Sequence, residues 1–158
     1  MAEEKVLEGK ETHIVHVGVI VKDLEKTVEF LTSLGFGPFN TAAYKHPNAI
    51  VRGKKTFWET KVALSKQGPV ELELIEFQKG TSIQKEFLDK RGEGIHHLLF
   101  KVRNINATIE KFANKGIAVL QRDFPGGVGG PAYMDTAATG GICIEVMEDL
   151  PGFDADEN

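Results

Sequence analysis

Cysteine is nearly absent from this sequence: Cys143 is the single one in 158 residues. One cysteine excludes a disulfide within the chain and is typical of a reducing compartment. No apolar run approaches the roughly 18 residues that a membrane-spanning helix needs. The charged residues 1–12 also lack the apolar stretch of a signal peptide. We therefore expect a cytoplasmic protein with no membrane partner.

Clustered basic residues are also lacking. The 19 Lys and Arg residues are outnumbered by 23 Asp and Glu residues, which gives a net charge of −4. A phosphate backbone requires a concentrated basic surface, so we expect no nucleic-acid partner. The content of 41% apolar residues is sufficient for the core of one compact domain.

An internal repeat is the most informative feature that the sequence does contain. A shift of 81 positions aligns residues 16–29 with residues 97–110 without a gap, and pairs His16 with His97. Each copy consists of a β-branched strand, an Asp or Asn at a helix N-cap, and an amphipathic helix that ends near a glycine. The repeat predicts two modules with the same local fold.

Further strands are expected after each helix, and a short helix is expected between the two halves. The expected strands cover 57–65 and 70–77 in the first half, and 117–121, 132–135 and 141–147 in the second. The sequence thus predicts an α+β fold in which two tandem βαβββ modules form a curved mixed sheet around a metal-binding cleft. A single domain, 1–158, would comprise module one at about 13–78, a linker helix at about 82–91, module two at about 95–148 and an acidic tail at 149–158.

Four strands each present one potential metal ligand on the face opposite their aliphatic side chains, because neighbouring strand residues point to opposite faces. These residues are His16, Glu73, His97 and Glu145. They occupy the first and last strand of each module, so a two-fold arrangement brings them together. Two neutral imidazoles and two carboxylates balance one divalent ion, and this ligand set suits Co, Mn, Ni, Zn or Fe. Two positions of an octahedron would remain for water or a chelating substrate.

The other histidines are expected to have different roles. The alternation places His96 on the helix-facing side of its strand, as a buried and hydrogen-bonded residue rather than a ligand. His13, at a strand start, and His46, before Pro47, are expected at the surface.

Two further side chains share a face with the expected ligands. Glu71 lies on the face of Glu73, where it either supports the ligands or is solvated. Cys143 shares the face of Glu145 and is expected to line the cleft, but a thiol without an activating partner is a poor nucleophile.

Four short motifs resemble the vicinal oxygen chelate superfamily, which includes glyoxalases, bleomycin-resistance proteins and dioxygenases. They are His-Val-Gly from residue 16, Glu-Leu-Ile-Glu from 73, Gly-Glu-Gly-Ile-His-His from 92 and Gly-Gly-Ile-Cys-Ile-Glu from 140. The resemblance covers about residues 13–148. Within it, residues 87–97 look most like methylmalonyl-CoA epimerases, in which the second histidine of the pair is the ligand.

The resemblance implies a divalent-metal-dependent epimerase, often a homodimer, that acts on a small molecule such as a CoA thioester. Its metal would bind the thioester carbonyl and a carboxylate oxygen, and stabilise the enediolate that forms when the alpha proton is removed. Epimerisation needs acid–base groups on opposite faces of that carbon. Glu145 matches one of these groups. Glu59 is the nearest counterpart of the other, and Lys61, on the same strand face, is the alternative to Glu59.

Two departures leave the substrate open. Those epimerases usually carry His-Pro-Lys where this chain has Asp135-Thr136-Ala137, and extra sequence between Gly35 and Phe57, including 40–52, would reshape one wall of the pocket. A glyoxalase I-type lyase or isomerase uses the same order of ligands and is the alternative. An extradiol dioxygenase normally uses two histidines and one carboxylate, so Glu73 argues against it. A metal-free binding protein of the bleomycin-resistance type would not need four converging ligands.

Overall fold

The computed structural model describes residues 3–8, 13–124 and 129–149. Its elements follow one another as β1 (His16–Val21), α1 (Leu24–Ser33), β2 (Asn40–Val51), β3 (Lys54–Gln67), β4 (Val70–Gly80), α2 (Ile83–Arg91), β5 (Gly94–Val102), α3 (Ile105–Asn114), β6 (Val119–Arg122), β7 (Ala132–Met134) and β8 (Cys143–Glu148). The order is βαβββ, a helix, and βαβββ again.

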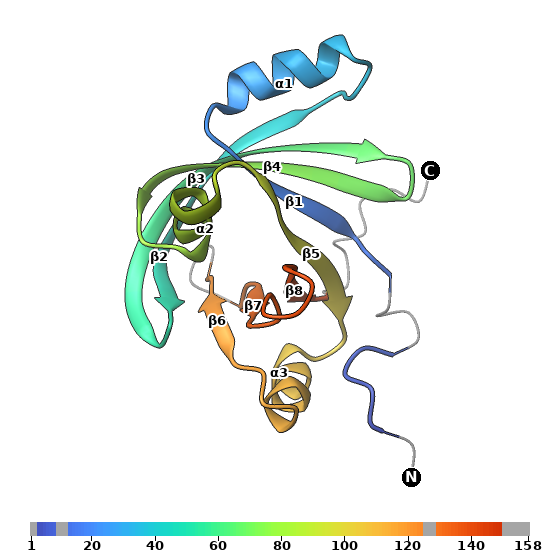
Figure 1. Cartoon of the computed structure of the whole chain (residues 1–158), viewed down its shortest axis with the longest axis vertical. Coiled ribbons are helices and arrows are strands. Elements are labelled where there is room, and N and C mark those ends of the chain that lie inside the picture. The colour runs from blue at the N-terminus through green and yellow to red at the C-terminus, as the bar shows by residue number, and fades with distance from the viewer. Residues whose placement is uncertain (1–2, 9–12, 125–128, 150–158) are drawn as a thin grey trace.

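The strands form a closed barrel in the order β1-β4-β3-β2-β6-β7-β8-β5 (Figure 1). Each module contributes four neighbouring strands. The modules meet where β1 pairs with β5 and where β2 pairs with β6, both antiparallel. Within the modules β1 is parallel to β4, and β5 is parallel to β8. The expected α+β fold with a curved mixed sheet is therefore confirmed.

The repeat extends to the helix caps. The side chain of Asp23 accepts a hydrogen bond from the Lys26 backbone N–H, and that of Asn104 accepts one from Ala107. The backbone angles of the two cap residues agree, with φ of −140° and −143° and ψ of 103° and 105°. Both helices are amphipathic and pack on the outside of the barrel.

The two faces of the sheet bury different cores. On the outside, α1 covers Val21, Ala63 and Leu74, and the helix α3 covers a cluster that includes Val102 and Val146. Inside the barrel, Ile20, Ala49, Trp58, Val62 and Ile75 pack together. Strand alternation explains the separation, because Ile20 and Val21 are neighbours that point in opposite directions.

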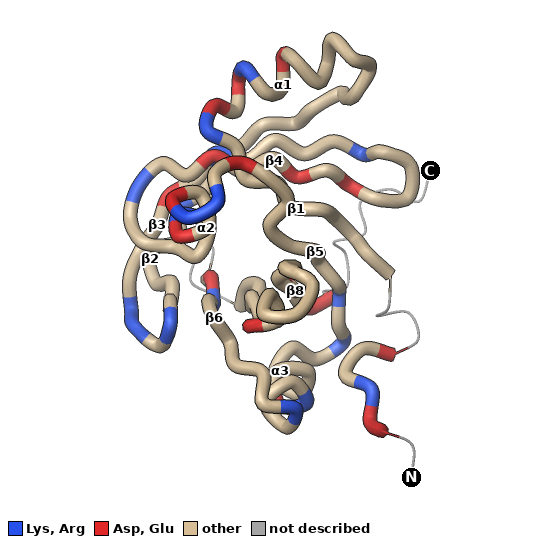
Figure 2. Tube along the Cα trace, in the orientation of Figure 1, with Lys and Arg blue, Asp and Glu red and all other residues tan. Residues whose placement is uncertain are grey.

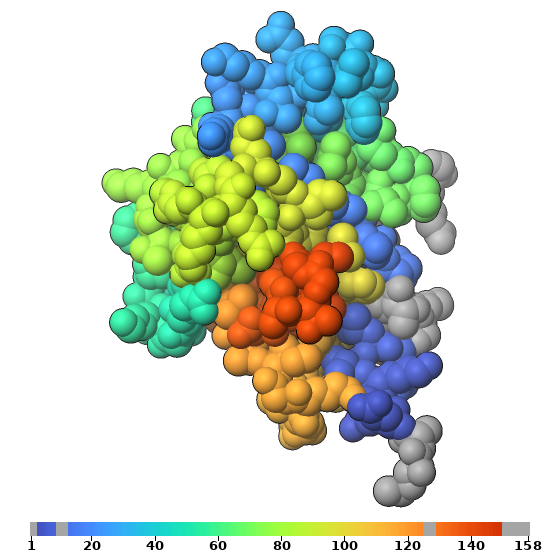
Figure 3. Space-filling model, viewed as in Figure 1, coloured from blue at the N-terminus to red at the C-terminus, as the bar shows by residue number. Residues whose placement is uncertain are grey.

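The linker helix α2 closes one end of the barrel. Phe87 and Leu88 pack against the interior cluster, and Ile83 packs with Val51, Tyr133 and Cys143. In Figure 3, α2 and the segment between β7 and β8 lie side by side over the middle of the visible face. The barrel interior is therefore filled with side chains, and α2 shields its polar groups from water at this end.

Strand β2 was missing from the sequence-based list of strands. Residues 40–51 form a strand that pairs with β3, and the register shifts between His46 and Ala49. Pro47 lies in this irregularity, which is where a strand tolerates a residue without a backbone N–H. The segment 40–52, expected to reshape a pocket wall, is thus a barrel strand and the turn that follows it.

Acidic and basic residues are mixed along the chain. In Figure 2 their positions are interspersed along the trace rather than separated by sign. Within the described ranges, no helix is both long enough and apolar enough to cross a membrane. The expected acidic tail lies outside the described residues apart from Asp149, whose backbone N–H donates to the Val102 carbonyl.

The Asn104 cap predicts a measurable contribution to stability. Asn104→Ala removes the acceptor for the Ala107 N–H and should lower the free energy of unfolding by about 1 kcal/mol in urea titrations. Asn106→Ala, at an exposed position two residues along, is the matched control and should cost nothing. Equal losses in both variants would contradict the assigned cap.

Candidate metal centre

Four side chains from four strands meet inside the barrel. His16 of β1, Glu73 of β4, His97 of β5 and Glu145 of β8 each offer one ligand atom, and these atoms all lie within 4.8 Å of one another. The strands β4, β1, β5 and β8 are consecutive in the barrel. The structure therefore brings together the four residues that the sequence singled out, at the junction of the two modules.

The separations between the ligand atoms suit one ion. The two histidine Nε2 atoms are 3.1 Å apart, and each lies 3.0 Å from a Glu145 oxygen. The Glu73 oxygen lies 3.2 Å from His16 and 3.3 Å from His97. Metal–ligand bonds of about 2.1 Å place adjacent ligand atoms about 3 Å apart. Two imidazoles and two carboxylates at these separations fit a divalent transition ion.

Burial distinguishes the four candidate ligands. His97 is fully buried, while His16 and Glu145 are almost so. The Glu73 side chain is the most open, with 16% of its surface exposed. Any bound molecule would therefore reach the group most easily beside Glu73.

Gly18 makes room for His97. It pairs with Glu73 in β4 on one side and with His97 in β5 on the other. A Cβ atom at this position would lie 2.1 Å from Cε1 and 2.2 Å from Nε2 of His97. The Gly of the His-Val-Gly motif is thus required by the close approach of the imidazole to the β1 backbone.

Without an ion, protons balance the charges of this group. Burial lowers the pKa of His97, but the charges and hydrogen bonds of Glu145 and Glu73 outweigh it and raise the value to about 10. Burial likewise opposes charge on His16, and the same two carboxylates raise its pKa. Burial disfavours the Glu145 carboxylate, yet His97 and His16 lower its pKa below the usual range. A divalent ion would replace these protons.

His96 is buried and hydrogen-bonded, as expected, but the strict alternation fails around it. Val19 pairs with Ile95 and Gly18 with His97, so His96 is an extra residue in a β-bulge. Its Nδ1 lies 3.0 Å from Nδ1 of His97. Burial and the nearby His97 lower the pKa of His96 to about 3, so its ring is neutral.

Tyr133 and Cys143 line the same interior. Tyr133 pairs with Glu145 across β7 and β8, and its ring lies edge-on to His97 with 5.3 Å between centroids. Burial and the charge of Glu145 raise the pKa of Tyr133 well above its usual value. Cys143 is buried as expected, and burial raises the pKa of its thiol to about 12, so it is not a nucleophile at neutral pH.

A polar network was not anticipated from the sequence. The Trp58 indole N–H and the Gln121 amide both donate to Asp123, and Gln121 also donates to Gln84. All four are buried. Their signal in the sequence was weak, because they come from three separate parts of the chain, namely β3, α2 and the end of β6.

His46 belongs with this network, so its expected surface position is wrong. It is 8% exposed and stacks on Trp58 with 4.6 Å between ring centroids. Its Nδ1 has no hydrogen-bond partner among the described residues. Burial lowers the pKa of His46 to about 4, although Glu73 acts in the opposite direction. Residues 40–51 were not expected to form a strand, so the sequence did not indicate that His46 would point into the barrel. His13 is exposed, as expected.

Glu59 and Lys61 lie on the other side of β3. Trp58 and Val62 of this strand point into the barrel, and Ala63 packs towards α1. Glu59 and Lys61 share the outward side with Ala63, because the pairing of β3 with β2 is regular here. Neither belongs to the group of four ligands. The placement argues against both as proton-transfer groups.

Glu71 is half-buried on the inward face of β4 and is not a member of the group of four either.

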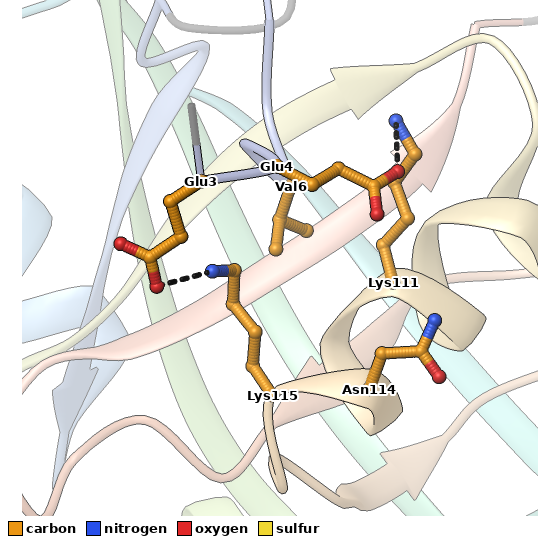
Figure 4. A pocket seen from close by; sticks show the side chains of 6 residues that line it. All are labelled: Glu3, Glu4, Val6, Lys111, Asn114 and Lys115. Carbon is orange, nitrogen blue, oxygen red and sulfur yellow. Dashed lines mark hydrogen bonds and ion pairs between the residues drawn. The ribbon is translucent and has the colours of Figure 1, made fainter. Parts of the chain in front are cut away.

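A surface cavity of about 220 Å³ lies away from the ligand group (Figure 4). It forms where the N-terminal segment lies against α3, and its walls include the ion pairs Lys115–Glu3 at 3.1 Å and Lys111–Glu4 at 3.8 Å. Such exposed pairs contribute little free energy. No metal ligand lines this cavity, so we assign it no function.

The chain matches one family model. Residues 15–134 match the model described as the glyoxalase/bleomycin resistance protein/dioxygenase superfamily. The uncharacterized protein YqjC of Bacillus subtilis is 26% identical over 136 residues, which cover 84% of this chain and 89% of YqjC.

Solved structures show the same fold. A hypothetical protein from Bacillus halodurans is 22% identical with a TM-score of 0.64, and the match covers 92% of this chain and 98% of that one. Methylmalonyl-CoA epimerase from Mycobacterium tuberculosis is 21% identical with a TM-score of 0.63, covering 96% and 94%. A Streptomyces coelicolor methylmalonyl-CoA epimerase in complex with 2-nitronate-propionyl-CoA is 26% identical with a TM-score of 0.64, covering 88% and 98%.

The close approach at Gly18 predicts the effect of one added methyl group. Gly18→Ala should displace the His97 ring and weaken Co²⁺ binding by about 100-fold. This is the upper end of the usual loss of affinity when a metal ligand is misoriented. Gly129→Ala, where a Cβ would meet nothing within 4 Å, should bind like wild type. Unchanged affinity in a folded Gly18→Ala variant would contradict the geometry.

The raised histidine pKa values predict that metal binding releases protons. His97, with a pKa of about 10 when metal-free, is protonated at pH 7, so an ion must displace its proton and apparent affinity should rise with pH. By the same linkage, protonation of His97 stabilises the metal-free fold. This contribution is fully present below pH 6.5, the pKa of histidine in the unfolded chain, and is lost as pH rises towards 10. Calorimetry in buffers of different ionisation enthalpy measures the release. Binding without proton release would contradict it.

Proposed function

The chain belongs to the glyoxalase/bleomycin resistance/dioxygenase superfamily, and we propose that it is a divalent-metal-dependent isomerase that removes a proton alpha to a carbonyl. The observation that supports this most is the convergence of two histidines and two glutamates within 4.8 Å. A metal-free binding protein has no use for such a group, because holding four titratable side chains together inside a barrel is costly.

The residues would divide the work between them. His16, His97 and Glu73 would hold the ion, which supplies Lewis-acid polarisation of a substrate carbonyl when bound. Glu145 is the proposed base as well as a ligand. A carboxylate is ionised at neutral pH, and Glu145 lies within the group that would hold the ion, so it could accept a proton from a carbon beside a polarised carbonyl.

A 2-substituted acyl thioester is the proposed substrate class. Solved methylmalonyl-CoA epimerases of this fold are in complex with methylmalonyl-CoA or with 2-nitronate-propionyl-CoA. Asp135-Thr136-Ala137 differs from the usual epimerase triplet, so the acyl group of this chain's substrate is left unassigned. Cytoplasmic location and a homodimer remain predictions.

Epimerisation also needs a second proton-transfer group on the opposite face of the reacting carbon. Among the titratable residues of β2 and β3, His46 points into the barrel, and its buried Nδ1 has no hydrogen-bond partner among the described residues. We therefore favour His46 over Glu59 and Lys61 for this role. His46→Phe should abolish interconversion of the two epimers but leave Glu145-dependent exchange of one epimer's alpha proton.

Exchange of the alpha proton tests the proposed chemistry. The Co²⁺-loaded protein should exchange this proton of a 2-methyl malonyl thioester with deuterated water, and a chelator should stop the exchange. Glu145→Gln should slow exchange by roughly 10²–10⁴-fold, the usual effect of losing a positioned base. Glu59→Gln, on the outward side of β3, is the matched carboxylate control and should stay active.

Three outcomes would redirect the assignment. Turnover of the hemithioacetal of methylglyoxal and glutathione, without exchange on malonyl thioesters, would indicate a glyoxalase I-type lyase or isomerase. An inactive Glu59→Gln variant that keeps its metal would restore Glu59 as a proton-transfer group, and loss in Lys61→Met alone would assign that role to Lys61.

A further inference from the structure

Two neighbouring histidines of β5 share one hydrogen bond. In a regular strand His96 and His97 would point to opposite faces, but the bulge turns both rings into the interior. Their Nδ1 atoms are 3.0 Å apart, and both residues are buried, with 6% and 0% exposed. Where no ion lies between them, two ring nitrogens can approach this closely only if one carries a hydrogen and the other does not.

The location of His97 Nε2 decides which nitrogen carries that hydrogen. This atom faces His16, Glu73 and Glu145 at 3.0–3.3 Å, so it is the nitrogen available to an ion. A coordinating nitrogen carries no proton, and a neutral imidazole must then carry its proton on the other nitrogen. His97 Nδ1–H is therefore the donor and His96 Nδ1 the acceptor.

The His96 ring is itself fixed by aromatic contacts. Phe87 of α2 lies edge-on to it, with 5.1 Å between centroids and an angle of 84°. Tyr133 of β7 lies 6.3 Å away on centroids and also contacts His97. The closing helix α2 thus holds the acceptor in place for the ligand.

We propose that His96 is the positioning residue of the metal centre, which fixes the tautomer and ring orientation of His97 by accepting its Nδ1–H. This role rests on the proposed metal-dependent function. Metal-bound histidines usually donate their second N–H to a carboxylate, a backbone carbonyl or water. Here a neutral imidazole takes that place, so the ligand is oriented without a further negative charge beside it.

Substitutions at His96 separate positioning from packing. His96→Phe keeps an aromatic ring but removes the acceptor, and should weaken Co²⁺ binding by about 10–100-fold. His96→Asn, whose Oδ1 can accept near the place of Nδ1, should recover most of the affinity. Phe87→Leu is the packing control and should affect affinity less than His96→Phe does. Equal affinity of His96→Phe and wild type would overturn the proposal, as would failure of His96→Asn to exceed His96→Phe.

Nitrogen-15 spectra of the histidine rings test the donor and acceptor without metal or activity. In the metal-free wild-type protein, His97 Nδ1 should carry a proton, and His96 should carry its proton on Nε2 alone. A proton on His96 Nδ1 would overturn the proposal. If wild type bound no divalent ion, the proposed function would fail by itself, and the spectra would still report on the hydrogen bond between the two rings.

Discussion

The crowding of two imidazoles and two carboxylates at the junction of the modules is the constraint on which the rest of the structure depends. Four ligand atoms within 4.8 Å, on residues that are mostly buried, are tolerable only with protons or a cation between them. Several features of the fold serve this arrangement. Gly18 leaves space for the His97 ring, and the bulge at His96 provides its hydrogen-bond partner. The helix α2 and the segment beside it cover the barrel end.

The duplicated architecture was accessible from sequence because its signals are local. The pairing of His16 with His97 at a spacing of 81 residues carried over to caps with nearly the same backbone angles at Asp23 and Asn104. Alternation along regular strands then separated the candidate ligands from core residues. It worked for Glu73 between Leu72 and Leu74, whose aliphatic side chains pack towards α1.

The features that sequence reasoning missed lie where alternation is interrupted or where partners are distant. His46 was expected at the surface beside Pro47, yet a bulge accommodates Pro47 within β2 and leaves His46 stacked inside the barrel. The bulge in β5 turned His96 towards His97, which no pattern in one strand could indicate. The resemblance to the epimerases indicated Glu59 as a proton-transfer group, and this role stays a prediction. The register of β3 with β2, a long-range property, places Glu59 on the outward side.

X-ray absorption of the Co²⁺-loaded protein tests the central claim most directly, because it reports on the ligands and not on turnover. The account predicts one ion per chain with nitrogen and oxygen neighbours at about 2.0–2.2 Å, and multiple scattering from two imidazoles. His97→Ala should show one imidazole fewer. A sulfur neighbour at about 2.3 Å, or an ion without imidazole ligands, would contradict a centre built from His16, Glu73, His97 and Glu145.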